Sequence, residues 1–313
     1  MGGGSWSAAT YSAVASARVA SGTAFSYDRT AKATGRYKAH ESNDPKRLNA
    51  AGLNVRESRD SVEHPFSKPM VIGFDQTGSM GSVPGEMQAR LKTVFQLTLD
   101  KGVKDVQVAV AAYGDAANDE RVPLQISQFE SDNRIDDALD NLFLEGNGGG
   151  NGGETSNLLF YYLAYHTELD CFDKRGEKGK VYLIADERQV PITAAHVKKY
   201  IGDGEPLGDL SYEGIAAAVT EKYDVTILLI NNRSAQGQRS EEFYSNLFGP
   251  DNVVIVQDTK AIPEMIAGLF AYDLGRSIDD IKADLTASVG NAIAVRVTDA
   301  LARRGSAKNV ALR

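Results

Sequence analysis

One short stretch of this 313-residue chain carries oxygen side chains in a pattern that suits a metal ion. Apolar residues and a glycine lead into Asp75, and Thr77 and Ser79 follow at intervals of two. Carboxylate and hydroxyl oxygens are the ligands that a small, hard cation such as Mg²⁺ prefers. Gly78 lets the backbone turn tightly enough for these alternate side chains to converge. The alternative is a turn that only caps the next helix, as Ser, Thr and Asp often do.

The elements around this stretch predict where it lies. An apolar run before a polar, glycine-bearing turn is typical of a buried strand that ends in a loop. Similar apolar runs recur along the chain and alternate with segments of helical spacing, which predicts an α/β fold: a doubly wound, mostly parallel sheet with helices on both faces. Ligands of such sheets bind outside the carboxyl ends of the strands. The runs in question cover residues 71–75, 106–112, 180–185, 224–230 and 253–256.

Two other strand ends in this pattern carry acids. Asp115 follows the run 106–112, and it is either an acid near the site or a turn cap. Asp186 and Glu187 follow the run 180–185 in the same way. Because the carboxyl ends of parallel strands meet at one edge of the sheet, these acids are candidates for the same site.

A glycine-rich loop supplies further candidates. Residues 145–156 contain many glycines, which permit unusual backbone angles, and they lead into an aromatic-rich helix near 158–167. Glu154 and Thr155 stand just before this helix, where Thr155 is also a natural cap. A flexible surface loop is the alternative.

The residues Asp75, Thr77 and Ser79 resemble the metal-ion-dependent adhesion site of the von Willebrand factor A domain, in the form found in intracellular bacterial or phage proteins. The family pattern is Asp-x-Ser-x-Ser, and Thr77 keeps the hydroxyl of the residue it replaces. The resemblance covers roughly residues 69–272. It implies that Thr77 and Ser79 bind the metal directly and that Asp75 acts through water.

The resemblance also implies the rest of the ligand set. Thr155 is the expected donor of the glycine-rich loop, with Glu154 as the alternative, and Asp186 completes the site through water. The expected cofactor is Mg²⁺, or Mn²⁺ or Ca²⁺ in its place. The resemblance places Asp115, Asn151 and Glu187 around the direct ligands of the metal.

The function that follows from the resemblance is a metal-dependent protein-binding module, not an enzyme. It would act as an adaptor that engages an Asp or Glu of a partner, and the resemblance implies a MoxR-type AAA+ ATPase as one such partner. The alternative is a structural subunit of a large assembly, such as a virion or secretion particle, that contacts neighbouring subunits through its arms. A metal-dependent phosphohydrolase is a third hypothesis, for which Asp115 and Glu187 are the only additional acids.

The composition restricts partners and location. A net charge of −8 argues against broad nucleic-acid binding, and no specific nucleic acid is predicted. The single cysteine excludes an internal disulfide and fits a reducing compartment. No apolar stretch has the length of a membrane span, and no secretory signal is recognised. The expected location is the cytoplasm, or a particle assembled there.

Three regions are expected along the chain. Residues 1–68 are predicted to form an extended, largely irregular arm, which is either flexible or anchored on a partner by Trp6 and Tyr11. Residues 69–275 form the α/β domain, and residues 276–313 form a C-terminal helix with a basic, mobile tail. Cys171 is placed in a polar loop over residues 170–180, and a catalytic role for it is not favoured.

Overall fold

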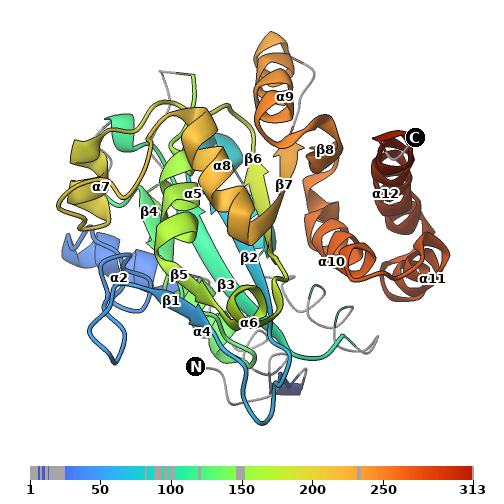
Figure 1. Ribbon diagram of the computed structural model, residues 1–313, viewed down its shortest axis with the longest axis horizontal. Coiled ribbons are helices and arrows are strands. Elements are labelled where there is room, and N and C mark those ends of the chain that lie inside the picture. Colours follow the sequence, from blue (N-terminus) through green and yellow to red (C-terminus); the bar gives the residue numbers. More distant parts are fainter. Residues whose placement is uncertain are drawn as a thin grey trace.

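The computed structural model describes residues 6–7, 9–10, 13, 25–81, 83–87, 94, 98, 103–118, 121–145, 152–230 and 234–311, with the backbone alone at Ser79 and at 305–311. A six-stranded sheet forms the centre, in the order β4-β3-β2-β6-β7-β8 (Figure 1). All neighbouring strands are parallel except β3 and the edge strand β4. The strands are β2 (Lys68–Asp75), β3 (Val106–Tyr113), β4 (Leu124–Ile126), β6 (Gly179–Ala185), β7 (Tyr223–Ile230) and β8 (Val253–Val256).

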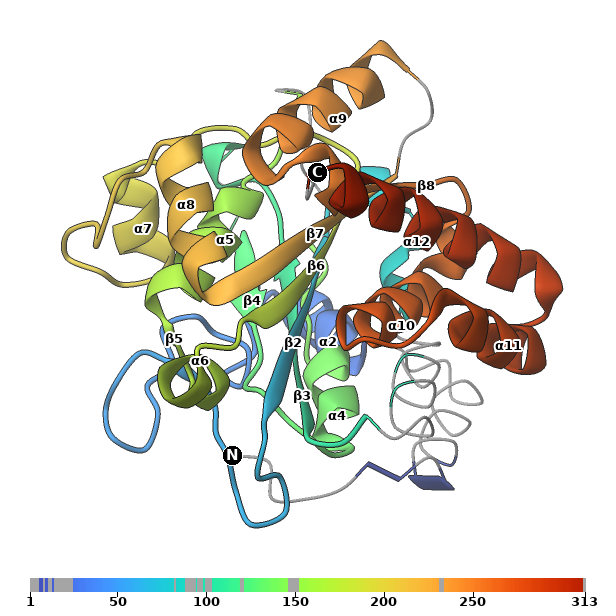
Figure 2. The same cartoon turned by 45° about the vertical axis from the view of Figure 1, so that its right-hand side comes forward.

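Helices cover both faces of this sheet, because alternate residues of each strand point to opposite sides. In β2, Met70, Ile72 and Phe74 belong to one apolar core and Val71 to the other. Figure 2 shows the two helical layers from the side. The first core includes α4 (Arg134–Asp140), α10 (Ile262–Asp273), α11 (Ile278–Val289) and α12 (Asn291–Ala311). The second includes α5 (Ser156–Tyr165), α7 (Ala194–Tyr200), α8 (Tyr212–Lys222) and α9 (Ala235–Phe248).

The predicted architecture, a mostly parallel sheet with helices on both faces, is therefore confirmed at this level. The chain places β3 on one side of β2 and then crosses to β6 on the other side. The carboxyl ends of β2 and β6 thus form a point at which the strand order reverses, where ligands of such sheets usually bind. Close packing fixes α5 over this point: a Cβ atom on Gly73 would lie 2.8 Å from Cδ2 of Leu159 and 3.2 Å from Cδ1 of Leu183.

The N-terminal segment differs from the predicted arm. From Phe25 onward it includes α2 (Ser26–Thr34) and β1 (Arg56–Ser58), and β1 pairs in parallel with the short strand β5 (Thr167–Leu169). The Asn43 amide donates to Ala138 O at 2.8 Å, and Asn43 O accepts from the Ile126 N–H at 2.9 Å. These hydrogen bonds attach the N-terminal segment to the α/β domain. They leave no periodic pattern of apolar residues from which they could be predicted.

The extreme N-terminus is described at a few residues only. Trp6 packs against the first core, and the Asn133 side chain bonds both backbone groups of Ser7, at 2.9 and 3.0 Å. Trp6 is therefore anchored on its own chain, whereas the two sequence alternatives were a flexible arm and an arm anchored on a partner. Tyr11 lies outside the described residues.

The C-terminal region also differs from the prediction of a basic, mobile tail. Ile281 of α11 and Leu301 of α12 are buried in the first core. Helix α12 approaches α10 so closely that a Cβ atom on Gly268 would lie 2.7 Å from Cγ1 of Val297. Arg304 is only 4% exposed and pairs with Asp273 at 3.4 Å. Ion pairing with an acid 31 positions earlier draws this arginine inward.

Cys171 lies in α6 (Asp170–Arg175), where a loop was expected, and it is buried. Burial raises the pKa of its thiol to about 11, which suppresses the thiolate that nucleophilic chemistry requires. Within the described part of the chain, no helix combines the length and apolar character needed to span a bilayer.

Candidate functional site

Five acids lie at the carboxyl edge of the sheet: Asp75 ends β2, and the other four lie in loops at this edge. Asp75 and Asp115 are fully buried, Glu154 is 3% exposed, and Asp186 and Glu187 are half-buried. We call these five residues the acidic edge. Carboxylates are rarely buried without compensating contacts, so the surroundings of each acid decide what the edge can do.

Two buried tyrosines lie beside the acidic edge. The Tyr113 hydroxyl donates to Ile184 O at 2.8 Å, and the Tyr244 hydroxyl donates to Glu187 O at 3.0 Å. Burial is the first cause that raises the pKa of each phenol. The charges of Asp75, Glu154 and Asp186 raise both pKa values further. Both hydroxyls therefore remain protonated donors beside the acids.

The loop after β2 is fixed by its own acid. Oδ1 of Asp75 accepts the backbone N–H of Thr77 at 2.7 Å, and the N–H of Gln76 donates to Tyr113 O at 2.8 Å. Thr77 stands at the cap of the short turn Gly78–Met80, but its side chain makes no capping bond there. The Thr77 hydroxyl therefore does not cap this turn, unlike in the alternative that the sequence left open. The side chain of Ser79 lies outside the described residues.

Two glutamines that the sequence reading did not single out support this loop. The Gln76 amide donates to Val122 O at 2.6 Å, and its Oε1 accepts from Gln125 Nε2 at 2.9 Å. Gln125 Oε1 in turn accepts the N–H of Phe143 at 2.9 Å. This buried chain of amides joins the edge strand β4 to the loop after Asp75. Its partners lie far apart in the sequence, so no local pattern signals it.

Thr155 and Asp115 serve the backbone of the loops. The Thr155 hydroxyl donates to Gly114 O at 2.7 Å and accepts the N–H of Ala116 at 2.9 Å. Oδ1 of Asp115 accepts the N–H groups of Ala117 and Asn118 at 2.9 and 3.3 Å. Of the two roles left open for Asp115, the structure shows the turn cap.

A backbone bridge holds Glu154 beside the loop after β6. The N–H of Glu154 donates to Arg188 O at 3.0 Å, and Glu154 O accepts the N–H of Val190 at 3.0 Å. The preceding residue must be glycine, because a Cβ atom on Gly153 would lie 2.6 Å from Arg188 O. Asn151, the outer position in the same loop, lies outside the described residues.

Replacing Gly153 with alanine should therefore separate the two loops and destabilise the protein by about 1–3 kcal/mol, the usual cost of overpacking a tight site. Gly204→Ala is the matched control, since a Cβ atom there meets nothing within 4 Å. Urea unfolding followed by circular dichroism measures both variants. Equal stability of the two variants would show that the bridge does not constrain Gly153.

Asp186 and Glu187 are the acids nearest to solvent. Oδ1 of Asp186 is buried and has no hydrogen-bond partner among the residues that the structure describes. Glu187 accepts a hydrogen bond from the Gln236 amide. Burial, followed by the charge of Asp186, raises the pKa of the Glu187 carboxyl above its ordinary value.

The raised pKa of Glu187 predicts a pH dependence of stability. The folded state holds the proton more tightly than the unfolded state, so stability falls as the pH rises through the raised pKa. Glu187→Gln removes this loss. The stability of the variant relative to wild type should therefore increase as the pH rises above about 4.3, the ordinary pKa of a glutamate, and level off above the raised pKa. Urea unfolding at several pH values tests it, and a difference that stays constant with pH would contradict it.

The described residues contain no group of three or more His, Cys, Asp or Glu side chains placed to hold a metal ion. The acidic edge thus brings predicted residues to one end of the sheet, but several of their oxygens bond the backbone. Chemically, the arrangement fixes loops and concentrates negative charge at the rim. The class that fold and site define is an open, mostly parallel α/β protein with an acidic carboxyl edge.

Comparisons with known proteins give remote likenesses only. No protein-family model matches the chain, and no curated protein matches it either. Among solved structures, it is similar to the pilus adhesin SpaC of Lactobacillus rhamnosus GG, with 14% identity and a TM-score of 0.46 over 69% of this chain and 30% of that one. It is also similar to the pilus adhesin RrgA of Streptococcus pneumoniae (12% identity, TM-score 0.38, 70% of this chain and 46% of that one).

A third likeness is to the adhesive tip pilin GBS104 of Streptococcus agalactiae, with 10% identity and a TM-score of 0.38 over 66% of this chain and all of that one. The chain spans less than half the length of the SpaC and RrgA chains. Likenesses this remote carry no conclusion about function.

The predicted membership of the von Willebrand factor A family is corrected by these findings. SpaC and RrgA are described as pilus adhesins, no family model matches, and the described residues hold no metal-binding group. The motif Asp75-x-Thr77-x-Ser79 gave a wrong prediction because the same short pattern also occurs in loops that hydrogen-bond to their own backbone. Oδ1 of Asp75 makes such a bond here. The expected Mg²⁺ stays a prediction from donor types alone, which calorimetry with Mg²⁺ would test.

Proposed function

We propose that this chain is a structural, non-enzymatic subunit of a larger assembly in which copies of the chain contact one another. The observation that carries the proposal is a concentration of exposed apolar side chains in one segment. Within the described part of the chain, five of the six exposed large apolar residues fall between positions 37 and 66. They are Tyr37, Leu48, Leu53, Val62 and Phe66, and we call them the apolar segment; the sixth is Leu207.

Exposed apolar side chains often mark a contact with another molecule when they form a contiguous patch, and five of them fall within thirty positions of this chain. Polar contacts such as those of Asn43 help to hold this segment, and Leu48, Leu53, Val62 and Phe66 are each more than half exposed. Cations lie over two of the rings: Arg121 is 4.6 Å from the centre of Tyr37, and Arg175 is 5.7 Å from that of Phe66. Figures 1 and 2 both show the segment on the side of the molecule away from α11 and α12.

Sedimentation velocity over a range of protein concentrations tests this proposal. Wild-type protein should associate as the concentration rises, and Leu48→Ser combined with Leu53→Ser should shift it toward the monomer. Leu207→Ser is the matched control, because Leu207 is as exposed as Leu48, at 56%. Wild-type protein that stays monomeric throughout would contradict the proposal. The adaptor role with a MoxR-type ATPase depended on the corrected resemblance and is not proposed; a cytoplasmic location stays a prediction.

A further inference from the structure

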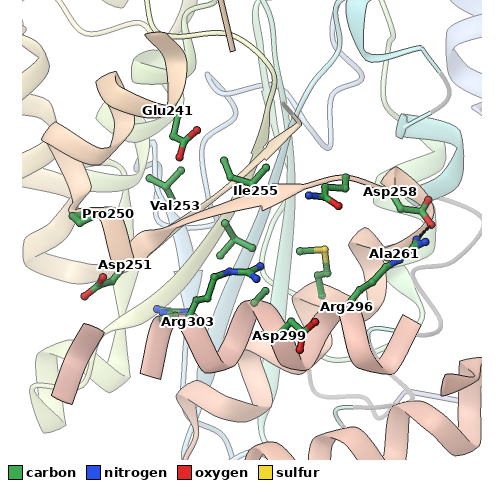
Figure 3. Close-up of a pocket in the computed structure, with 15 residues that line it drawn as sticks. Glu241, Pro250, Asp251, Val253, Ile255, Asp258, Ala261, Arg296, Asp299 and Arg303 are labelled. Atoms are coloured by element: carbon green, nitrogen blue, oxygen red, sulfur yellow. Dashed lines mark hydrogen bonds and ion pairs between the residues drawn. The ribbon is translucent and has the colours of Figure 1, made fainter. Parts of the chain in front are cut away.

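The charged groups between β8 and α12 indicate no single class of ligand. Figure 3 shows the cavity that they line, of about 490 Å³. Four carboxylates, those of Glu241, Asp251, Asp258 and Asp299, stand against three arginines, and Arg296 is paired with Asp258. A lining of both signs selects neither an anion nor a cation. A histidine in the other helical layer has surroundings that are chemically more specific.

His166 follows α5, and both nitrogens of its buried ring face oxygen atoms. Its side chain is 7% exposed. Nδ1 lies 2.7 Å from Asn54 O, and Nε2 lies 2.9 Å from Oδ2 of Asp203. A carbonyl oxygen and a carboxylate oxygen only accept hydrogen bonds, whereas a neutral imidazole has a single N–H to donate. With one ring proton, a nitrogen lone pair would face one of these oxygens, and a second proton removes that conflict.

The Tyr161 hydroxyl fixes the position of the Asp203 carboxylate. It donates to the same Oδ2 at 2.8 Å and accepts the N–H of Leu207 at 2.9 Å. Burial raises the pKa of the Tyr161 phenol, so this hydroxyl keeps its proton. A proton between Asp203 and His166 belongs to the ring, because a free aspartic acid loses its proton at about pH 3.9 and a free imidazolium at about pH 6.5.

Other charged and titratable groups around the ring come from α5, α8 and the N-terminal segment. Tyr162 stacks on the His166 ring with the centres 5.0 Å apart, and burial raises the pKa of its phenol to about 12. Arg56 lies 5.8 Å from the centre of the Tyr162 ring, and the charge of Asp44 opposes that of Arg56. Lys222 donates to the carbonyl of the residue after His166 at 3.0 Å. The Asp203 carboxylate touches the ring directly, and charge interactions weaken with distance, so its attraction dominates.

We infer that a second proton on His166 fastens a pH-sensitive latch within the fold. With both nitrogens protonated, the ring donates at once to Asn54 of the N-terminal segment and to Asp203 in the loop after α7. Loss of one proton breaks one of these bonds. The latch holds two places that carry exposed apolar side chains, since Leu53 precedes Asn54 and Leu207 is bonded to Tyr161. The inference concerns the single chain and does not depend on the proposed assembly.

Urea unfolding at several pH values tests the latch. The folded chain should bind the second proton more tightly than the unfolded chain, so the stability of wild type relative to His166→Gln should rise as the pH falls. Between about pH 8 and pH 5, the ratio of the two folding equilibrium constants should rise at least about tenfold. His196→Gln is the matched control. Nδ1 of His196 accepts the N–H of Thr193 at 3.3 Å, so a proton there would remove a bond and this ratio should not rise.

Asp203→Asn gives a second, milder test. An amide can offer its N–H to Nε2 of a neutral ring, so this variant should fold, and wild type should show the same rise in stability relative to it as the pH falls. Nuclear magnetic resonance of ¹⁵N-labelled histidine gives the direct readout, with His166 assigned from the spectrum of His166→Gln. At about pH 7, where a free imidazole is mostly neutral, both ring nitrogens of His166 should carry protons. A ratio that stays constant with pH, or a ring with one protonated nitrogen at that pH, would overturn the latch.

Discussion

Replacing Arg56 with methionine is expected to lower the free energy of unfolding by about 3–5 kcal/mol, because each buried acceptor left without its donor costs about 1–3 kcal/mol. Arg56 is 3% exposed, and its guanidinium donates only to main-chain carbonyls: Asp44 O at 2.6 Å, Arg47 O at 3.0 Å and Ile126 O at 3.3 Å. Burial lowers the pKa of this guanidinium. The variant leaves three acceptors without their donor, and unsatisfied buried groups are costly.

Urea unfolding of Arg56→Met beside Arg134→Met measures this effect. Arg134 is the control because its side chain is half exposed and its ion pairs are at the surface, where such pairs contribute about 0–1 kcal/mol. Hydrogen exchange adds a local readout, since amides of β1 and β5 should lose protection first. Similar losses in the two variants would show that Arg56 does not anchor the N-terminal segment.

Replacing Arg304 with methionine has a comparable expected effect, again about 3–5 kcal/mol. Asp273, with 4% of its side chain exposed, would lose its ion pair with Arg304. The Tyr182 hydroxyl, at 3.1 Å, would still donate a hydrogen bond to it. The main loss of stability comes from the Asp273 carboxylate, which would stay buried without a compensating positive charge. Adding Asp273→Asn should recover most of the stability, because a neutral amide still accepts from Tyr182.

The adjacent Arg303→Met is the control for that prediction, since an exposed side chain should change stability by no more than about 0.5 kcal/mol. Urea unfolding of the single and double variants gives the coupling between positions 273 and 304. A double variant as unstable as Arg304→Met alone would contradict the explanation by a stranded charge.

The strands were predictable because their apolar runs are continuous. Residues 71–74 and 181–185 are buried on both faces of the sheet, so each reads as an unbroken apolar stretch. The loops that follow were predictable in position for the same reason. The roles of Asp115 and Thr155 in these loops were not predictable, because a short carboxylate or hydroxyl can cap a turn or bind a ligand equally well. For Thr155, the contacts with Ala116 and Gly114 decide between the two roles.

The remaining differences arise from contacts between residues distant in the sequence. Arg56 bonds Ile126 across 70 positions, and Gln125 bonds Gln76 across 49. Such polar pairs produce no periodic pattern in the sequence. Residues 25–68 were therefore predicted to belong to an arm, although they pack on the domain. Arg304 was assigned to a basic tail from its immediate neighbours, while its partner Asp273 lies in another helix. Local composition predicts local structure, and these contacts are not local.

Negative-stain electron microscopy of the full chain, at the concentration where sedimentation first shows association, tests the proposed assembly most directly. The account predicts particles that contain several copies of the chain in a regular arrangement, and these disappear in the variant that carries both Leu48→Ser and Leu53→Ser. Fields of single, separate molecules of wild-type protein at every concentration would contradict it.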